Sequence, residues 1–180
     1  LGVPAILGEA FAVLRGKPLQ DKERSCLTYL GGISGLLDDF FDDPGKKADH
    51  LEKFVLSPGD LIPESTAEQL LRDFYWAGLK FSPHPELLKK QAMKVFNAQK
   101  QSLIQKEDHS EYFQLKESTY QKGGTSFVFY RLCLLDIPTQ EEEKMIFHLG
   151  GLMQLGNDIF DVWKDLQEGT KTIATEAKDI

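Results

Sequence analysis

The chain has 180 residues, of which 41% are hydrophobic and 27% charged, and this composition suits one soluble globular domain with a real core. A formal net charge of −7 and the lack of a basic stripe argue against a nucleic-acid-binding protein. No run of 18 apolar residues occurs, so we expect no membrane span, and no signal peptide is visible. Because the chain begins with Leu1 rather than Met, we expect a trimmed or partial sequence.

The two cysteines, Cys26 and Cys133, lie in apolar helical contexts without metal-like spacing. We expect both to be buried free thiols in a reducing compartment, which points to the cytoplasm.

Apolar residues recur at helical spacing along most of the chain, and no alternating segment is longer than residues 126–130. The expected helices cover residues 3–16, 21–43, 47–56, 66–80, 83–106 and 109–120, followed by a last long helix after Thr139. Ser65 and Thr139 open capping-box patterns, and the tail after Gly169 is expected to be mobile. The sequence therefore predicts one all-α domain over residues 1–180, an antiparallel bundle of about seven helices around a central cavity.

The last long helix carries an acidic face. Asn157, Asp161 and Asp165 stack four residues apart, and like charges at this spacing destabilise a helix by roughly 0.2–0.5 kcal/mol per pair. A bound divalent cation would reverse that sign. The opposite face is an apolar stripe that is expected to face the core, made of Leu152, Leu155, Ile159, Val162, Trp163 and Leu166.

A second acidic cluster ends the helix expected over residues 21–43. Asp38 and Asp42 form one i,i+4 pair, Asp39 and Asp43 form another, and the Pro-Gly pair at 44–45 terminates the helix. Carboxylates at a helix C-terminus oppose the macrodipole, by about 0.3–1 kcal/mol for an exposed charge. This arrangement also favours a bound cation.

The run Lys122-Gly123-Gly124-Thr125 interrupts an otherwise helical pattern. Two glycines inside a helix cost about 1 kcal/mol each relative to alanine. The run is either a plain loop between two helices or a break in one long helix that lines the cavity, and we predict the break.

The candidate ligands are carboxylates without convergent His or Cys side chains, which favours a hard cation such as Mg²⁺. The four histidines are scattered along the chain, so zinc is not expected, and no Glu-x-x-His pair of a di-iron bundle occurs. Phosphate-binding P-loop and dinucleotide fingerprints are also absent from the sequence.

These motifs resemble the class I isoprenoid synthases: trans-prenyltransferases, squalene and phytoene synthases, and class I terpene cyclases. Residues 38–42 look like the first DDxxD motif. Residues 157–165 are similar to the terpene-cyclase pattern ND-x-x-S-x-x-K-E, with Asp161 for Ser and Asp165 for Glu. They are equally similar to the prenyltransferase DD-x-x-D, with Asn157 for the first Asp, and to the phytoene-synthase run QL-x-N-x-x-x-DV-x-x-D.

Two further segments extend the resemblance, which spans roughly residues 25 to 172. Residues 122–125 lie where prenyltransferases have a Lys-Thr diphosphate contact and a kinked central helix. Gly169-Thr170-Lys171 is similar to the flexible loop that closes over their diphosphate.

The resemblance implies a Mg²⁺-dependent transferase that ionises an allylic prenyl diphosphate substrate, with a homodimer as an allowed assembly. The alternatives are a terpene cyclase and a non-catalytic relative that binds a prenyl diphosphate or a partner subunit. The implied metal ligands are Asp38, Asp39, Asp42, Asn157, Asp158, Asp161 and Asp165. The implied catalytic residues are Asp38, Asp42, Lys122 and Asp161, and the implied diphosphate-binding residues are Lys122, Lys164 and Lys171.

The main hypothesis concerns the placement of the two acidic motifs. We expect Asp38 and Asp42 to face Asn157, Asp161 and Asp165 across one cavity mouth, close enough to share a cluster of Mg²⁺ and diphosphate.

Overall fold

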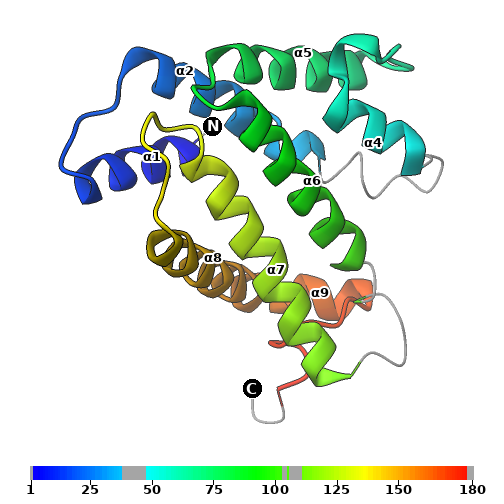
Figure 1. Ribbon diagram of the computed structural model, residues 1–180. Coiled ribbons are helices and arrows are strands. Elements are labelled where there is room, and N and C mark those ends of the chain that lie inside the picture. The colour runs from blue at the N-terminus through cyan, green and yellow to red at the C-terminus, as the bar shows by residue number, and fades with distance from the viewer. Residues whose placement is uncertain (1, 38–47, 103–104, 106–110, 178–180) are drawn as a thin grey trace. The chain divides into compact units, whose positions relative to one another are not determined.

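The computed structural model describes residues 2–37, 48–102, 105 and 111–177 (Figure 1). These residues form helices and turns without any strand, which confirms the prediction of an all-α fold. None of the helices in these ranges combines the length and the apolar character needed to cross a membrane. The bundle around a central cavity stays a prediction.

The chain divides into two compact units, Leu1–Met93 with Phe129–Ile137, and Lys94–Val128 with Pro138–Ile180. Two long helices, α6 (Pro85–Ser102) and α7 (Tyr112–Arg131), contribute residues to both units. Each unit is described by itself below.

The first unit is built around α2 (Asp21–Gly32), which packs against both α1 (Gly2–Leu14) and α5 (Thr66–Phe81) (Figure 1). It also contains α4 (Ala48–Leu56) and the short 3₁₀ helix η1 (Pro58–Asp60). Glycines permit close packing, since a Cβ on Gly31 would lie 2.7 Å from the Pro4 ring. The two cysteines are buried and free, as predicted, and their compartment stays a prediction.

Local capping signals correctly marked two helix starts. The Ser65 hydroxyl accepts the backbone N–H of Glu68 at 3.2 Å and caps α5. Thr139 caps α8 (Gln140–Phe160) by accepting the N–H of Glu142, also at 3.2 Å. The helix expected over residues 21–43 is instead interrupted, because α2 ends at Gly32, Ile33 is a turn, and residues 34–37 are helical again.

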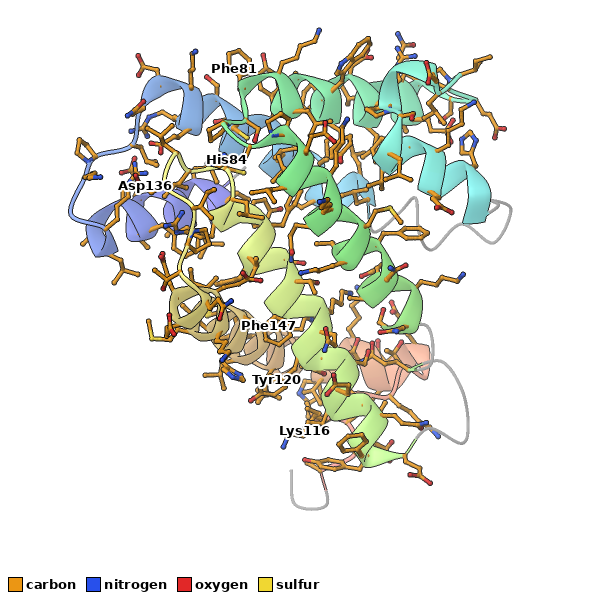
Figure 2. All side chains as sticks on the ribbon, in the orientation of Figure 1. Phe81, His84, Lys116, Tyr120, Asp136 and Phe147 are labelled. Carbon is orange, nitrogen blue, oxygen red and sulfur yellow. The ribbon has the colours of Figure 1, made fainter. Side chains whose placement is uncertain are left out.

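A buried carboxylate ties α2 to the loop after α7. The Glu23 side chain is 2% exposed and accepts two bonds of 2.6 Å from the Arg15 guanidinium. It also accepts the backbone N–H of Leu135 at 2.6 Å. In the same loop, the Leu135 carbonyl lies 2.8 Å from Nε2 of His84 (Figure 2 labels His84 and the neighbouring Asp136). Burial alone would raise the pKa of Glu23, but the hydrogen bonds and the charge of Arg15 outweigh it and lower the pKa to about 2.

The second unit contains most of α7, the helix α8, the short helix α9 (Val162–Glu168) and the second half of α6. Helices α7 and α8 pack antiparallel through glycines. A Cβ on Gly123 would overlap the carbonyl oxygen of Gly150 and lie 2.7 Å from Cβ of Gln154. On the neighbouring turns, Gly124 packs on Phe147 and Gly151 on Tyr120 (the two aromatic residues are labelled in Figure 2).

Both interpretations of the 122–125 run were therefore wrong. Helix α7 passes through Gly123 and Gly124 without a loop or a break, and both glycines are buried. The glycines are there because the two backbones approach more closely than any side chain allows. The Thr125 hydroxyl donates to the carbonyl of Gln121 at 2.7 Å, a bond typical of a threonine within a helix.

The apolar stripe of the last long helix is also not where we expected it. Trp163 is 73% exposed, and Leu152, Ile159 and Leu166 are each more than half exposed. The buried face of α8 instead presents Ile146, Gly150, Gly151 and Asp158. The glycine contact with α7 fixes this rotation of α8, and only Val162 of the predicted stripe is buried.

The segment after α9 is packed rather than polar and loose, contrary to the prediction. Gly169 adopts φ 70°, a left-handed conformation that ends the helix and favours glycine. The backbone N–H of Lys171 then donates to the carbonyl of Gln105 at 2.8 Å, and Thr172 and Ala174 are buried.

We predict that Gly150→Ala destabilises the protein by about 1–3 kcal/mol, because the added methyl group must push α7 away from α8. The measurement is the free energy of unfolding in urea. Gly156→Ala is the matched control in the same helix, since nothing lies within 4 Å of a Cβ at Gly156. That variant should gain roughly 0.5–1 kcal/mol, as expected for alanine replacing a helical glycine. Equal effects of the two changes would contradict the close contact.

We predict that Glu23→Gln costs about 3–5 kcal/mol, because it leaves Arg15 and the backbone N–H groups of Gln20 and Leu135 without their charged acceptor. The folded pKa is lower than the unfolded value of 4.5, so the carboxylate stabilises the protein above that pH. This contribution should be lost as the pH falls toward about 2. The free energy of unfolding of the natural protein and of Glu23→Gln, measured from pH 7 to pH 2, should therefore differ less and less as the pH falls.

Glu9→Gln is the control for this change, because Glu9 forms an exposed pair with Arg24 at 2.6 Å. Exposed pairs contribute about 0–1 kcal/mol. A Glu23→Gln protein as stable as the Glu9→Gln protein would contradict the role given to the buried carboxylate.

Candidate acidic site on α8 and α9

The structure describes one of the two predicted acidic motifs. Asp38, Asp39 and Asp42 lie outside the described residues, so the facing arrangement of the two motifs stays a prediction. The other predicted site residues all belong to the second unit: Lys122, Asn157, Asp158, Asp161, Lys164, Asp165 and Lys171.

Asp158 is the buried member of the motif. It is 5% exposed and lies on the face of α8 that packs against α7. Its Oδ2 accepts the hydroxyl of Thr119 at 2.9 Å, and its Oδ1 accepts Nε2 of Gln154 at 2.9 Å. Both partners are neutral, so they fix the orientation of the carboxylate without neutralising its charge.

Asn157 and Asp161 form a second pair, which faces solvent. Nδ2 of Asn157 donates to Oδ2 of Asp161 at 3.1 Å, one helical turn away. Helix α8 ends at Phe160, and Asp161 has φ −91° and ψ 4° before α9 begins. The i→i−4 bonds nevertheless continue from Asp161 to Asn157 and from Asp165 to Asp161, both at 2.9 Å. The predicted stacking of these three residues on one face therefore survives the junction.

The environment of the acidic motif shifts the pKa of Asp165. Its pKa is raised, first by partial burial and then by the negative charges of Asp158 and Asp161. The ammonium of Lys164 acts in the opposite direction but does not reverse the shift. A cation bound among these carboxylates would remove the repulsion.

The three lysines expected to contact diphosphate lie on α7, on α9 and in the segment after α9. Lys122 is half-buried on α7, three residues after Thr119, the partner of Asp158. Lys164 is exposed on α9, within the motif itself. Lys171 is half-buried in the segment after α9, which its backbone bond to Gln105 holds in place.

The three carboxylates are not gathered around one point. Within the part of the chain that the structure describes, Asp158, Asp161 and Asp165 do not offer three ligand oxygens that all lie within 4.8 Å of one another. The site therefore offers separated oxygen ligands along two turns. Such a set suits several ions that share a bridging ligand better than it suits one enclosed ion.

Sequence reasoning missed Thr119 as a member of the site. Gln154 was within the motif segment, and its i,i+4 spacing to Asp158 was a usable signal. Thr119 lies 39 residues from Asp158, and only the packing of α7 on α8 brings them together.

No protein-family model, curated protein or solved structure matches the chain. The resemblance to the class I isoprenoid synthases therefore stays a prediction from the motifs.

We predict that Asp165→Asn raises the melting temperature at pH 7. Because the folded pKa of Asp165 is raised, the folded protein binds its proton more tightly, and stability falls as the pH rises through that pKa. The uncharged amide of the Asp165→Asn variant does not ionise, so the variant does not lose this stability. The difference between the variant and the natural protein should vanish near pH 3.5, below the ordinary aspartate pKa of about 3.9.

Thermal unfolding at several pH values measures this effect. Glu176→Gln, which removes an exposed carboxylate after α9, should give no comparable gain at pH 7. A destabilised Asp165→Asn protein at neutral pH would refute the repulsion.

Proposed function

We propose that the protein is a Mg²⁺-dependent class I isoprenoid synthase that acts on an allylic prenyl diphosphate. The observation that carries this proposal is the face formed by Asn157, Asp161 and Asp165, with Asp158 fixed behind it. Its ligands are oxygens, and the pKa of Asp165 is raised by partial burial and, after that, by the charges of Asp158 and Asp161. Hard divalent cations prefer such ligands.

Diphosphate explains why the carboxylates are spread along two turns. Mg²⁺ usually takes one or two carboxylates and completes its octahedron with water and substrate phosphates. Asn157, Asp161 and Asp165 would hold the ions, and the diphosphate would supply the oxygen ligands that these side chains leave open. When bound, Mg²⁺ supplies charge that favours departure of diphosphate from an allylic carbon.

The residues of the chain have separate tasks in this proposal. Asp161 and Asp165 hold the cation, and Asn157 orients Asp161 through its amide. Asp158 keeps α8 in register on α7 through Thr119 and adds negative charge to the site. Lys122, Lys164 and Lys171 contact the diphosphate, and Asp38, Asp39 and Asp42 supply the second set of ligands. Magnesium, the transferase activity and a homodimer are parts of the same proposal.

A second candidate function is that of a non-catalytic relative that binds prenyl diphosphate or a partner subunit. The exposed part of the apolar stripe favours it, because Ile159 is 57% and Trp163 73% exposed, and Phe160, which follows Ile159, is 89% exposed. Apolar side chains gathered on one face of a soluble chain mark surfaces that other proteins cover. A terpene cyclase remains the alternative within the enzyme class.

Incubation with Mg²⁺ and geranyl, farnesyl or geranylgeranyl diphosphate tests the proposal, with diphosphate release and extractable products as readouts. Release only with added isopentenyl diphosphate would indicate chain elongation. Release without it would indicate cyclisation or hydrolysis. Stabilisation by prenyl diphosphate without any release would support the non-catalytic candidate.

We predict that Mg²⁺ together with inorganic diphosphate raises the melting temperature well beyond either alone, because each supplies ligands that the other needs. At 100 times the dissociation constant, such binding adds about 2.7 kcal/mol to stability. Asp161→Asn should abolish the joint effect. Glu168→Gln, an exposed carboxylate of α9 outside the motif, should retain it. A melting temperature that is indifferent to the mixture would refute the proposed site.

A further inference from the structure

We propose that His50, Glu64 and Glu68 of the first unit form a second metal site, for a divalent transition-metal ion such as Zn²⁺. One ligand atom from each side chain lies within 4.8 Å of the other two. Among the residues that the structure describes, this is the one group of three His, Cys, Asp or Glu side chains that meets this limit. It shares no residue with the acidic face of α8 and α9.

Three separate segments bring these ligands together. His50 lies in the first turns of α4, Glu64 precedes the N-cap of α5, and Glu68 lies in the first turn of α5. Nε2 of His50 is 2.8 Å from Oε1 of Glu68. Zn²⁺ binds imidazole nitrogen and carboxylate oxygen at about 2.0–2.2 Å, which places neighbouring ligand atoms about 3 Å or more apart. The observed separation needs little adjustment to reach that geometry.

Glu68 is held in place before any ion binds. Its side chain is fully buried, and its Oε2 accepts the backbone N–H of Glu64. The Ser65 hydroxyl caps the same turn through the N–H of Glu68 at 3.2 Å. These bonds leave Oε1 directed at His50. Hydrogen bonds of this kind orient metal ligands and are worth 10–100-fold in affinity at known sites.

The ligand cluster is buried on one side and exposed to solvent on the other. The His50 side chain is 21% exposed, and Glu64 is exposed. A surface hollow of about 340 Å³ borders Glu64 and is lined by Pro63, Glu64, Ser65, Gln69 and Arg72. Water can therefore complete the coordination of an ion that three protein ligands hold.

The ligand types select the ion. One imidazole with two carboxylates suits Zn²⁺ and its first-row neighbours, whereas Mg²⁺ and Ca²⁺ prefer oxygen alone. The ion would take the place of the hydrogen shared by Nε2 of His50 and Oε1 of Glu68. It would also link α4 to the first turn of α5. The competing explanation is that the His50–Glu68 contact joins these helices without a metal.

Titration of the metal-free protein with Co²⁺ separates these explanations, because Co²⁺ in a nitrogen and oxygen site of low coordination number absorbs visible light. We predict saturable absorbance at one ion per chain, which Zn²⁺ displaces and excess Mg²⁺ does not. Zn²⁺ should also raise the melting temperature. His50→Ala and Glu64→Gln should each weaken Co²⁺ binding by about 100-fold or more, since each removes a direct ligand.

Two matched variants serve as controls. His148→Ala removes an exposed histidine of α8, and Glu52→Gln removes an exposed carboxylate of α4 close to His50 in sequence. Both should leave Co²⁺ affinity unchanged. The proposal is overturned if the natural protein gives no saturable absorbance, or if His50→Ala binds Co²⁺ as well as His148→Ala does. Failure of the Mg²⁺ and diphosphate experiment would leave this site unaffected, because its residues are different.

Discussion

The close approach of α7 and α8 at Gly123 and Gly150 is the constraint on which the second unit depends. Two helix backbones in contact cannot rotate about their axes without introducing a side chain between them. Gly151 lies on Tyr120 one residue further along, and Asp158 follows Gly151 by seven residues. Two residues seven positions apart in an α-helix point in directions that differ by only about 20°. The glycine contact therefore turns Asp158 toward Thr119.

The rotation of α8 determines which neutral and charged groups lie next to the carboxylates of the acidic motif. Asp158 becomes buried against a hydroxyl and an amide, neither of which carries a charge. Partial burial raises the pKa of Asp165, and the negative charges of Asp158 and Asp161 add to that shift. By contrast, Glu23 in the first unit is buried against a guanidinium, and its pKa is lowered to about 2. Burial acts to raise the pKa of Asp165 and of Glu23 alike, but only at Glu23 do the hydrogen bonds and the charge of Arg15 outweigh it.

The sequence was sufficient for what depends on neighbours along the chain. The all-helical class follows from apolar spacing, and the starts of α5 and α8 follow from Ser65 and Thr139, whose hydroxyls cap within three residues. The stacking of Asn157, Asp161 and Asp165 is a local property of the same kind.

The rotation of α8 was not available from the sequence, because it depends on a partner helix. Hydrophobicity indicated that Ile159 and Trp163 face the core, yet glycine packing turns them outward. The glycines at 123 and 124 gave an ambiguous signal, since a helix break and a close crossing both require residues without side chains. Likewise His50 and Glu64 are 14 positions apart in the sequence, and only the packing of α4 near the start of α5 makes them neighbours.

The same rotation separates two properties of the motif helix. Asp158 and Ile159 are adjacent in sequence, but one is buried against α7 and the other is more than half exposed. Successive residues of a helix point about 100° apart, so a protein that covered the apolar stripe would contact Ile159 and Trp163 without displacing Thr119 from Asp158. Association through the stripe and cation binding through the carboxylates can therefore coexist on one helix. Changing the stripe alone would reveal whether the two are coupled, because the carboxylates and their hydrogen bonds would stay in place.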